Sequence, residues 1–187
     1  MRRIIPKTKQ AVMINSQPKT NVKKNALNRV LMQGLKDGLA TEHTLITILP
    51  GYARVSVSAE LTSTFDLYAT QLEEHIDKLR LAFKSLGERP AQGSTIIRKI
   101  IIEVIASREE VLSIDMKLIR VARCIINFQI MEYSTLEKIA RLNDSTYVSS
   151  LLSFIVKQEI ERQKVLGRLE AEFQNRMQND KAGQTVG

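Results

Sequence analysis

Hydrophobic residues recur along most of this chain at intervals of three and four residues, which is the spacing of one face of an α-helix. Such stripes occupy four long segments, at residues 35–49, 61–86, 114–139 and 148–173, and one short segment at 96–104. Alternating patterns long enough for β-strands are absent from the sequence. The pattern therefore predicts an all-α fold, an antiparallel four-helix bundle with an additional short helix and brief loops.

Residues typical of helix ends separate these segments. Gly87 and Pro90 follow the second stripe and predict its end. Ser94 is a candidate cap for the short helix, and the Asn-Asp-Ser run at 143–145 predicts the turn before the last helix.

The charge of the chain is unevenly distributed. The 187 residues carry 28 Lys and Arg against 20 Asp and Glu, a formal net charge of +8. Eight of the basic residues lie within residues 1–29, where no acidic residue occurs, so 20 basic residues face 20 acidic ones in the rest of the chain. We therefore expect a basic flexible tail at 1–28, a formally neutral domain at 29–177 and a flexible C-terminal tail at 178–187.

Several classes of protein are excluded by composition. The apolar runs fall far short of the roughly 20 residues that span a bilayer, so we expect no membrane association and a cytoplasmic location. The single cysteine, Cys124, excludes an internal disulfide and a multi-cysteine zinc site, and its apolar neighbours predict a small core residue. No glycine-rich phosphate-binding loop occurs, which removes the support for nucleotide chemistry.

Polar residues interrupt the inner stripes. Glu42 lies on the apolar face of the first long segment, and Glu159 has a similar place in the last. An ionised carboxylate in such a place is costly unless it is paired or bound to a metal ion. Further polar side chains share the inner faces of the second and third long segments, namely Tyr68, Gln71, His75 and Gln129.

Carboxylates from several bundle helices, together with histidine, form the layout of a di-iron carboxylate site. Oxygen ligands and imidazole suit iron or manganese. The alternative is that these polar groups hydrogen-bond to one another or reach water at the end of the bundle. Spacing alone leaves both interpretations open.

The order of residues resembles the YciE/YciF ferritin-like family. Residues 35–50, LKDGLATEHTLITILP, are similar to the family's opening helix, which reads approximately LKDLYSAEKQLLKALP. The segments EEHIDKL at 73–79 and LGERP at 86–90 resemble the second helix and its LGEKP ending, and YSTL at 133–136 resembles a YGTL that follows the family's third-helix acidic motif. Leu151, Leu152 and Glu159 align with the closing helix, so the resemblance covers about residues 30–172.

The resemblance implies a ferritin-like four-helix bundle, often dimeric, that is associated with bacterial stress responses and suspected of binding metal. Carried over by position, it implies that Glu42, His75 and Glu159 are the retained metal ligands. This chain departs from the family elsewhere. Tyr68 and Gln71 stand where the family tends to have a histidine and a glutamate, and the third-helix motif, close to EHYE in the family, reads INFQ at 126–129.

These departures predict a degenerate site without catalytic residues. A di-metal site needs about four carboxylates, and Gln71 and Gln129 keep the shape of glutamate without its charge. Their amides and the Tyr68 hydroxyl can donate hydrogen bonds to Glu42 or Glu159, so we expect no cofactor. A single iron or manganese ion held by Glu42, His75 and Glu159 is the alternative.

The sequence therefore favours a non-catalytic structural or interaction protein of the stress-response type, forming a homodimer. One alternative is a di-iron carboxylate oxidase or ferroxidase, which the three retained ligands favour. The second is a module that binds nucleic acid nonspecifically through the basic tail, which has no aromatic residue to stack on bases.

Overall fold

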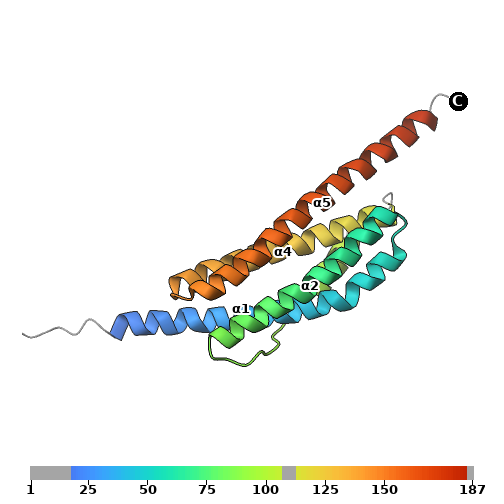
Figure 1. Cartoon of the computed structure of the whole chain (residues 1–187). Coiled ribbons are helices and arrows are strands. Elements are labelled where there is room, and N and C mark those ends of the chain that lie inside the picture. The colour runs from blue at the N-terminus through green and yellow to red at the C-terminus, as the bar shows by residue number, and fades with distance from the viewer. Residues whose placement is uncertain (1–17, 107–112, 185–187) are drawn as a thin grey trace, which may run out of the picture.

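The computed structural model describes residues 18–106 and 113–184, and every regular element within them is a helix (Figure 1). The five helices are α1 (Pro18–Val55), α2 (Ala59–Ser85), α3 (Ile97–Ala106), α4 (Ile114–Leu142) and α5 (Thr146–Gln184). The predicted all-α class, with four long helices and one short one, is confirmed. None of these helices, within the described residues, has the length and apolarity needed to cross a membrane.

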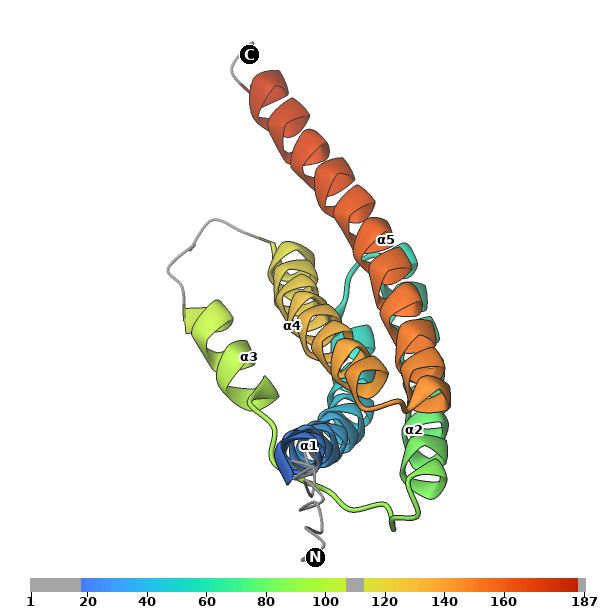
Figure 2. The same ribbon diagram turned by 90° about the vertical axis from the view of Figure 1, so that its left-hand side faces the viewer.

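The four long helices form two antiparallel hairpins that pack against each other. α1 and α2 are joined by a short turn at 56–58, and α4 and α5 by the predicted turn at 143–145. α1 lies against α4 and α2 against α5, while α3 lies outside the bundle against α4 and α1 (Figure 2). Ends of α1 and α5 project beyond the packed region (Figure 1).

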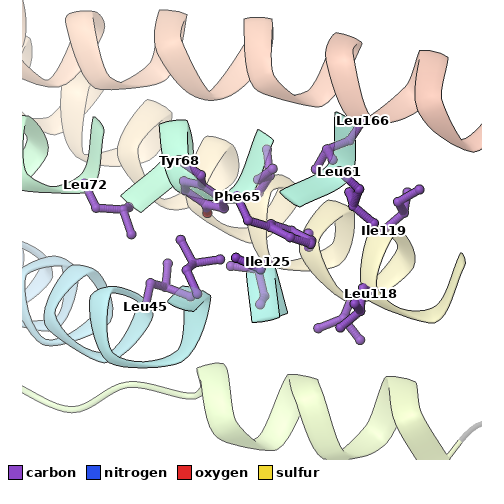
Figure 3. Close-up of a cluster of buried hydrophobic side chains, with 14 of the residues drawn as sticks. Leu45, Leu61, Phe65, Tyr68, Leu72, Leu118, Ile119, Ile125 and Leu166 are labelled. Atoms are coloured by element: carbon purple, nitrogen blue, oxygen red, sulfur yellow. The ribbon is translucent and has the colours of Figure 1, made fainter. Parts of the chain in front are cut away.

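The apolar faces of the four long helices form two clusters of buried side chains. One cluster, shown in part in Figure 3, includes Leu45, Phe65, Leu72, Ile125, Ile126 and Leu166. The other includes Leu35, Leu39, Ile76, Leu79, Tyr133 and Ile155. On each helix the sequence passes from one cluster to the other, and the buried polar residues of the inner stripes fall at that crossing. The bundle therefore has a polar layer between two apolar clusters.

The turn between α1 and α2 is fixed to the start of α4. Asp115 is 3% exposed, and its carboxylate accepts hydrogen bonds from the backbone N–H of Val57 at 2.8 Å and of Ser58 at 2.9 Å. The Ser56 hydroxyl donates to the same carboxylate at 3.2 Å. A negative charge in the first turn of α4 also interacts favourably with the helix dipole.

The structure corrects the predicted cap of α3. The backbone N–H of Ile97 donates to the Thr95 hydroxyl at 3.3 Å, whereas the backbone N–H of Ser94 donates to Asp37 of α1 at 2.7 Å. Ser94 is therefore bound to α1 and does not cap α3, and the Thr95 hydroxyl is the side-chain acceptor at the start of this helix. The connection at 86–96 is also longer than the brief loops expected.

The helix ends and one core prediction differ from expectation. α1 begins at Pro18 and α5 ends at Gln184, so the tails expected at 1–28 and 178–187 are helical over 18–28 and 178–184. The remaining tail residues lie outside the described residues. The prediction that Cys124 lies in the core is wrong, because its side chain is exposed. Cys124 precedes buried Ile126 by two residues, which places it about 200° away around the helix.

Candidate functional site

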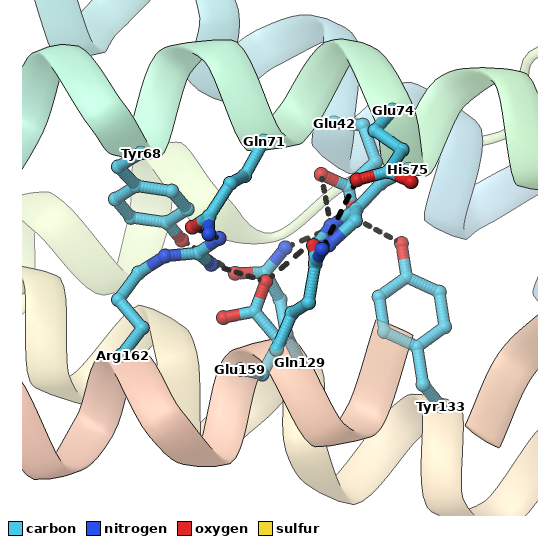
Figure 4. Close-up of polar contacts among 10 residues, drawn as sticks. Glu42, Tyr68, Gln71, Glu74, His75, Gln129, Tyr133, Glu159 and Arg162 are labelled. Atoms are coloured by element: carbon cyan, nitrogen blue, oxygen red, sulfur yellow. Dashed lines mark hydrogen bonds and ion pairs between the residues drawn. The ribbon is translucent and has the colours of Figure 1, made fainter. Parts of the chain in front are cut away.

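The polar layer receives one fully buried polar side chain from each long helix. These are Glu42 from α1, His75 from α2, Gln129 from α4 and Glu159 from α5, each 0% exposed (Figure 4). They converge because each occupies an inward position on its own apolar stripe, at the level where the two hydrophobic clusters meet. The structure thus brings the residues predicted on separate helices into one site.

The carboxylate of Glu42 is held from α4. Gln129 donates its amide N–H to Glu42 Oε1 at 3.0 Å, and the Tyr133 hydroxyl donates to the same oxygen. The Tyr68 hydroxyl donates at 2.7 Å to Gln129 Oε1, so the orientation of the amide is fixed, with its nitrogen toward Glu42. Burial, and then the nearby charge of Glu42, raise the pKa of Tyr133 well above its usual range, so this hydroxyl stays a donor.

His75 faces both carboxylates through one ring nitrogen. Its Nδ1 lies 3.6 Å from Glu42 Oε2 and 3.5 Å from Glu159 Oε1. Its Nε2 lies 2.8 Å from Gln158 Oε1, and the amide N–H of Gln158 donates to Glu74 at 3.0 Å. Because Gln158 presents its oxygen, Nε2 carries a hydrogen, and a proton on Nδ1 makes the ring a cation between two anions.

The pKa of His75 is raised by these surroundings. Burial acts to lower it, but the nearby carboxylate of Glu42, together with the charge of Glu159, outweighs that effect. The charged imidazolium is therefore more favoured here than in a free histidine side chain.

Glu159 is paired with an arginine from its own helix. Arg162 Nη1 lies 2.5 Å from Glu159 Oε1, and both side chains are buried. Arg162 Nη2 donates to Gln71 Oε1 at 2.6 Å, and the guanidinium carbon lies 3.7 Å from the centroid of the Tyr68 ring. Burial raises the pKa of Glu159, while the charges of Arg162 and His75 act to lower it.

Sequence reasoning missed Arg162. The sequence nevertheless contained a signal. The inner stripe of the last helix passes from Glu159 to Leu166, a gap of seven residues, and the helical spacing of three and four places Arg162 at the inward position between them. An arginine at such a position is usually assigned to the surface. The expectation that Gln71 donates to a carboxylate is corrected, since its oxygen accepts from Arg162.

The donor set does not match a di-iron site. Such a site in a four-helix bundle takes one glutamate from each of two helices and a Glu-x-x-His pair from each of the other two. Of the two helices that should each supply one glutamate, α1 supplies Glu42 but α4 supplies the amide of Gln129. Neither Glu-x-x-His pair is complete, because α2 has Leu72 three residues before His75, and α5 has Arg162 three residues after Glu159. No group of three or more His, Cys, Asp or Glu side chains in 18–106 and 113–184 is arranged so that it can hold a metal ion.

A groove of about 260 Å³ brings solvent close to the polar layer. It lies between α1, α4 and residues 94–96, and Gln129, Glu132 and Tyr133 form part of its wall. Gly38 makes room on α1, because a Cβ atom there would lie 3.0 Å from the Tyr133 ring. The two donors to Glu42 thus form part of the boundary between the buried charges and the surface.

Solved structures with the same arrangement of helices are ferritin-like proteins. The Escherichia coli stress protein YciF is 21% identical, with a TM-score of 0.72 over 80% of this chain and 97% of its own. Dps from Thermosynechococcus elongatus is 14% identical, with a TM-score of 0.63 over 79% and 94% of the two chains. A ferritin-like, diiron-carboxylate protein from Bacillus anthracis is 20% identical, with a TM-score of 0.61 over 76% and 96%. At these identities the likeness establishes the fold.

Family membership comes from the sequence. Residues 26–178 match the family described as a domain of unknown function, DUF892. Among curated proteins no relative matches the chain. The match and the fold shared with YciF confirm the resemblance to the YciE/YciF proteins. The chain therefore belongs to the DUF892 family and has a ferritin-like four-helix fold.

Proposed function

We propose that this chain is a non-catalytic ferritin-like protein of the stress-response type, which acts as a structural or interaction module and keeps the centre of its bundle free of metal. The observation that carries the proposal is the contribution of α4. Where a metal centre needs a carboxylate from this helix, Gln129 presents an amide nitrogen that donates to Glu42, and Ile126 fills the adjoining inner position with hydrocarbon.

The hydrogen bonds around Gln129 support this proposal. A metal ion bound by Glu42 Oε1 would face the hydrogens of the Gln129 amide and of the Tyr133 hydroxyl. Turning the amide to offer its oxygen to a metal ion would break its bond to Glu42 and would also take away the oxygen to which the Tyr68 hydroxyl now donates. The layer is therefore organised around hydrogen bonds to Glu42 and not around a cation at that position.

The first alternative is an iron-dependent oxidase or ferroxidase. It is favoured by the position of His75 Nδ1, which lies within 3.6 Å of a carboxylate oxygen of both Glu42 and Glu159, and by the nearby groove. It requires iron or manganese at these three residues. Fe(II) oxidation by the purified chain, followed by absorbance, distinguishes the two functions. We expect no acceleration over buffer, and rapid turnover would contradict a non-catalytic role.

Metal content tests the proposal directly. The full chain, purified without chelator and incubated with Fe(II) or Mn(II), should retain well below one ion per chain. The chain offers a matched pair of controls because it has two histidines, His75 in the polar layer and His43 in a surface groove. An ion bound at the surface through His43 should be lost in His43→Gln, whereas one or two ions per chain that are lost only in His75→Gln would contradict the proposal.

The proposal extends to a homodimer in the cytoplasm. Leu67 and Leu81 of α2 and Met131 of α4 are exposed, which an interface with a second copy would explain. Light scattering after size exclusion should give twice the chain mass of 21.2 kDa, and a monomer at micromolar concentration would contradict it. Nonspecific nucleic-acid binding by the basic tail stays a prediction, because residues 1–17 lie outside the described residues. Retention on DNA at low salt that is lost on deleting them would support it.

A further inference from the structure

We infer that the Arg162 guanidinium occupies the place of a metal ion in this bundle and serves as the permanent internal counter-ion of its buried carboxylates. The inference rests on the proposed metal-free function and goes beyond it. The site lacks carboxylates that a di-metal centre needs, and it contains a cation of its own. Arg162 then determines which cation the site holds.

Along the chain, Arg162 stands at the position of a metal-ligating histidine, and its guanidinium takes the place of the ion. In the Glu-x-x-His pair of a di-iron bundle, the histidine follows its glutamate by three residues and projects inward beside it. Arg162 follows Glu159 by the same interval and is only 5% exposed. A histidine there would bring a neutral nitrogen to a cation, whereas arginine brings a charge that it does not lose in proteins.

The contacts of Arg162 are those of a built cation site. One guanidinium nitrogen lies 2.5 Å from Glu159, another donates to Gln71 at 2.6 Å, and the flat face lies 3.7 Å from the centroid of the Tyr68 ring. Tyr68 thus supplies a π face and Gln71 a neutral acceptor, both of which suit a guanidinium.

Charge explains why the layer needs Arg162. Glu42 and Glu159 are both fully buried. Besides Arg162, the one cationic group beside them is the protonated ring of His75, which faces both carboxylates. Without Arg162 the layer would hold one carboxylate more than it has cations, and an uncompensated buried charge is strongly destabilising. With Arg162 in place, a divalent ion beside Glu159 would be repelled by the guanidinium at short range.

A double-mutant cycle on the full chain tests the counter-ion role. Arg162→Gln should lower the folding equilibrium constant by about 100-fold or more, because it leaves two buried carboxylates, Glu159 and Glu42, with His75 as their one shared cation. Adding Glu159→Gln to it should recover at least about tenfold of that loss, which removal of a mere packing contact would not do. Arg168→Gln is the matched control, since Arg168 lies on the same helix, is exposed and reaches Glu172 only at 4.0 Å, so a change within about twofold is expected.

The cycle stays decisive if the single variant does not fold. In that case circular dichroism of Arg162→Gln/Glu159→Gln should show a folded helical chain, which supports the inference. An Arg162→Gln variant as stable as the wild type would overturn it. A double variant no more stable than Arg162→Gln would overturn it as well.

A second arm uses Mn(II) alone as the probe. Arg162→His/Gln129→Glu rebuilds the Glu-x-x-His pair of α5 and the carboxylate of α4, and it should bind at least one more Mn(II) per chain than Gln129→Glu, which retains Arg162. Equal binding by the two variants would overturn the inference. Two ions in the wild-type chain would instead contradict the proposed function, so the two failures are distinguishable.

Discussion

Replacing Gln129 by glutamate distinguishes a metal-free centre from a metal centre that lacks one ligand. The two predict changes in stability of opposite sign. The change is isosteric and restores the carboxylate that a metal centre needs from α4. In a metal-free layer it exchanges a donor 3.0 Å from Glu42 Oε1 for a second anion in the same place. The layer would then hold three carboxylates against the two cations Arg162 and His75.

The cost can be worked from this geometry. Two unit charges 3.0 Å apart repel by about 5.5 kcal/mol at an effective dielectric constant of about 20. Proton uptake limits this cost, because two neighbouring carboxylates can share one proton. If sharing raises the pKa of the new carboxyl from about 4.3 to about 6.3 to 7.3, the loss at pH 7 is about 2.5 to 3.5 kcal/mol. The loss should shrink as the pH falls toward about 4.3, the value in the unfolded chain, since protonation then costs little.

The assay is urea unfolding followed by circular dichroism at pH 7 and pH 5, with a chelator present. Gln174→Glu is the matched control, because Gln174 is exposed on α5 and its replacement should change stability by less than about 0.5 kcal/mol. A Gln129→Glu variant that loses less than about 1 kcal/mol at pH 7, or loses more at pH 5 than at pH 7, would refute the reasoning. In a separate series without chelator, a gain in stability on adding Mn(II) to the variant, larger than any gain of the wild type, would show that Arg162 does not exclude the ion.

Three further predictions follow from other contacts. Asp115→Ala removes three hydrogen bonds at the turn between α1 and α2, so chemical denaturation should show a loss of about 2 to 3 kcal/mol, against less than about 0.5 for exposed Asp66→Ala. Gly93→Ala places a Cβ atom 2.8 Å from the backbone nitrogen of Asp37, and it should lower stability by about 1 to 3 kcal/mol and speed amide exchange at residues 93–95; unchanged exchange would contradict this. Because the pKa of His75 is raised on folding, its contribution to the free energy of unfolding is complete below about pH 6.5 and is lost as the pH rises through the pKa of the folded state. The free energy of unfolding should therefore fall from pH 6 to 9, and His75→Gln should reduce that fall.

Much of the fold could be predicted because the apolar stripes are long and regular. The polar exceptions on those stripes identified Glu42, His75, Gln129 and Glu159, since a buried carboxylate is unusual enough to stand out. The first part of α1 was missed because its pattern is sparse. Val22 and Val30 are exposed, and Leu31 is the first residue of the helix described as fully buried.

The partners within the site could not be predicted from spacing. Whether the Tyr68 hydroxyl donates to a carboxylate or to Gln129 depends on how the hairpins pack, and sequence periodicity does not contain that information. Arg162 was missed for a different reason. A long cationic side chain is normally placed at the surface, and only the combination of Glu159, Gln71 and the Tyr68 ring makes an inward orientation favourable.

The most direct test of the metal-free centre is a crystal structure of the full chain, grown with Mn(II) and measured for anomalous scattering. We predict no anomalous peak between Glu42 and Glu159, and electron density for the Arg162 guanidinium against Glu159 and the Tyr68 ring. An anomalous peak bound by Glu42, His75 and Glu159, with Arg162 turned out of the layer, would contradict the account.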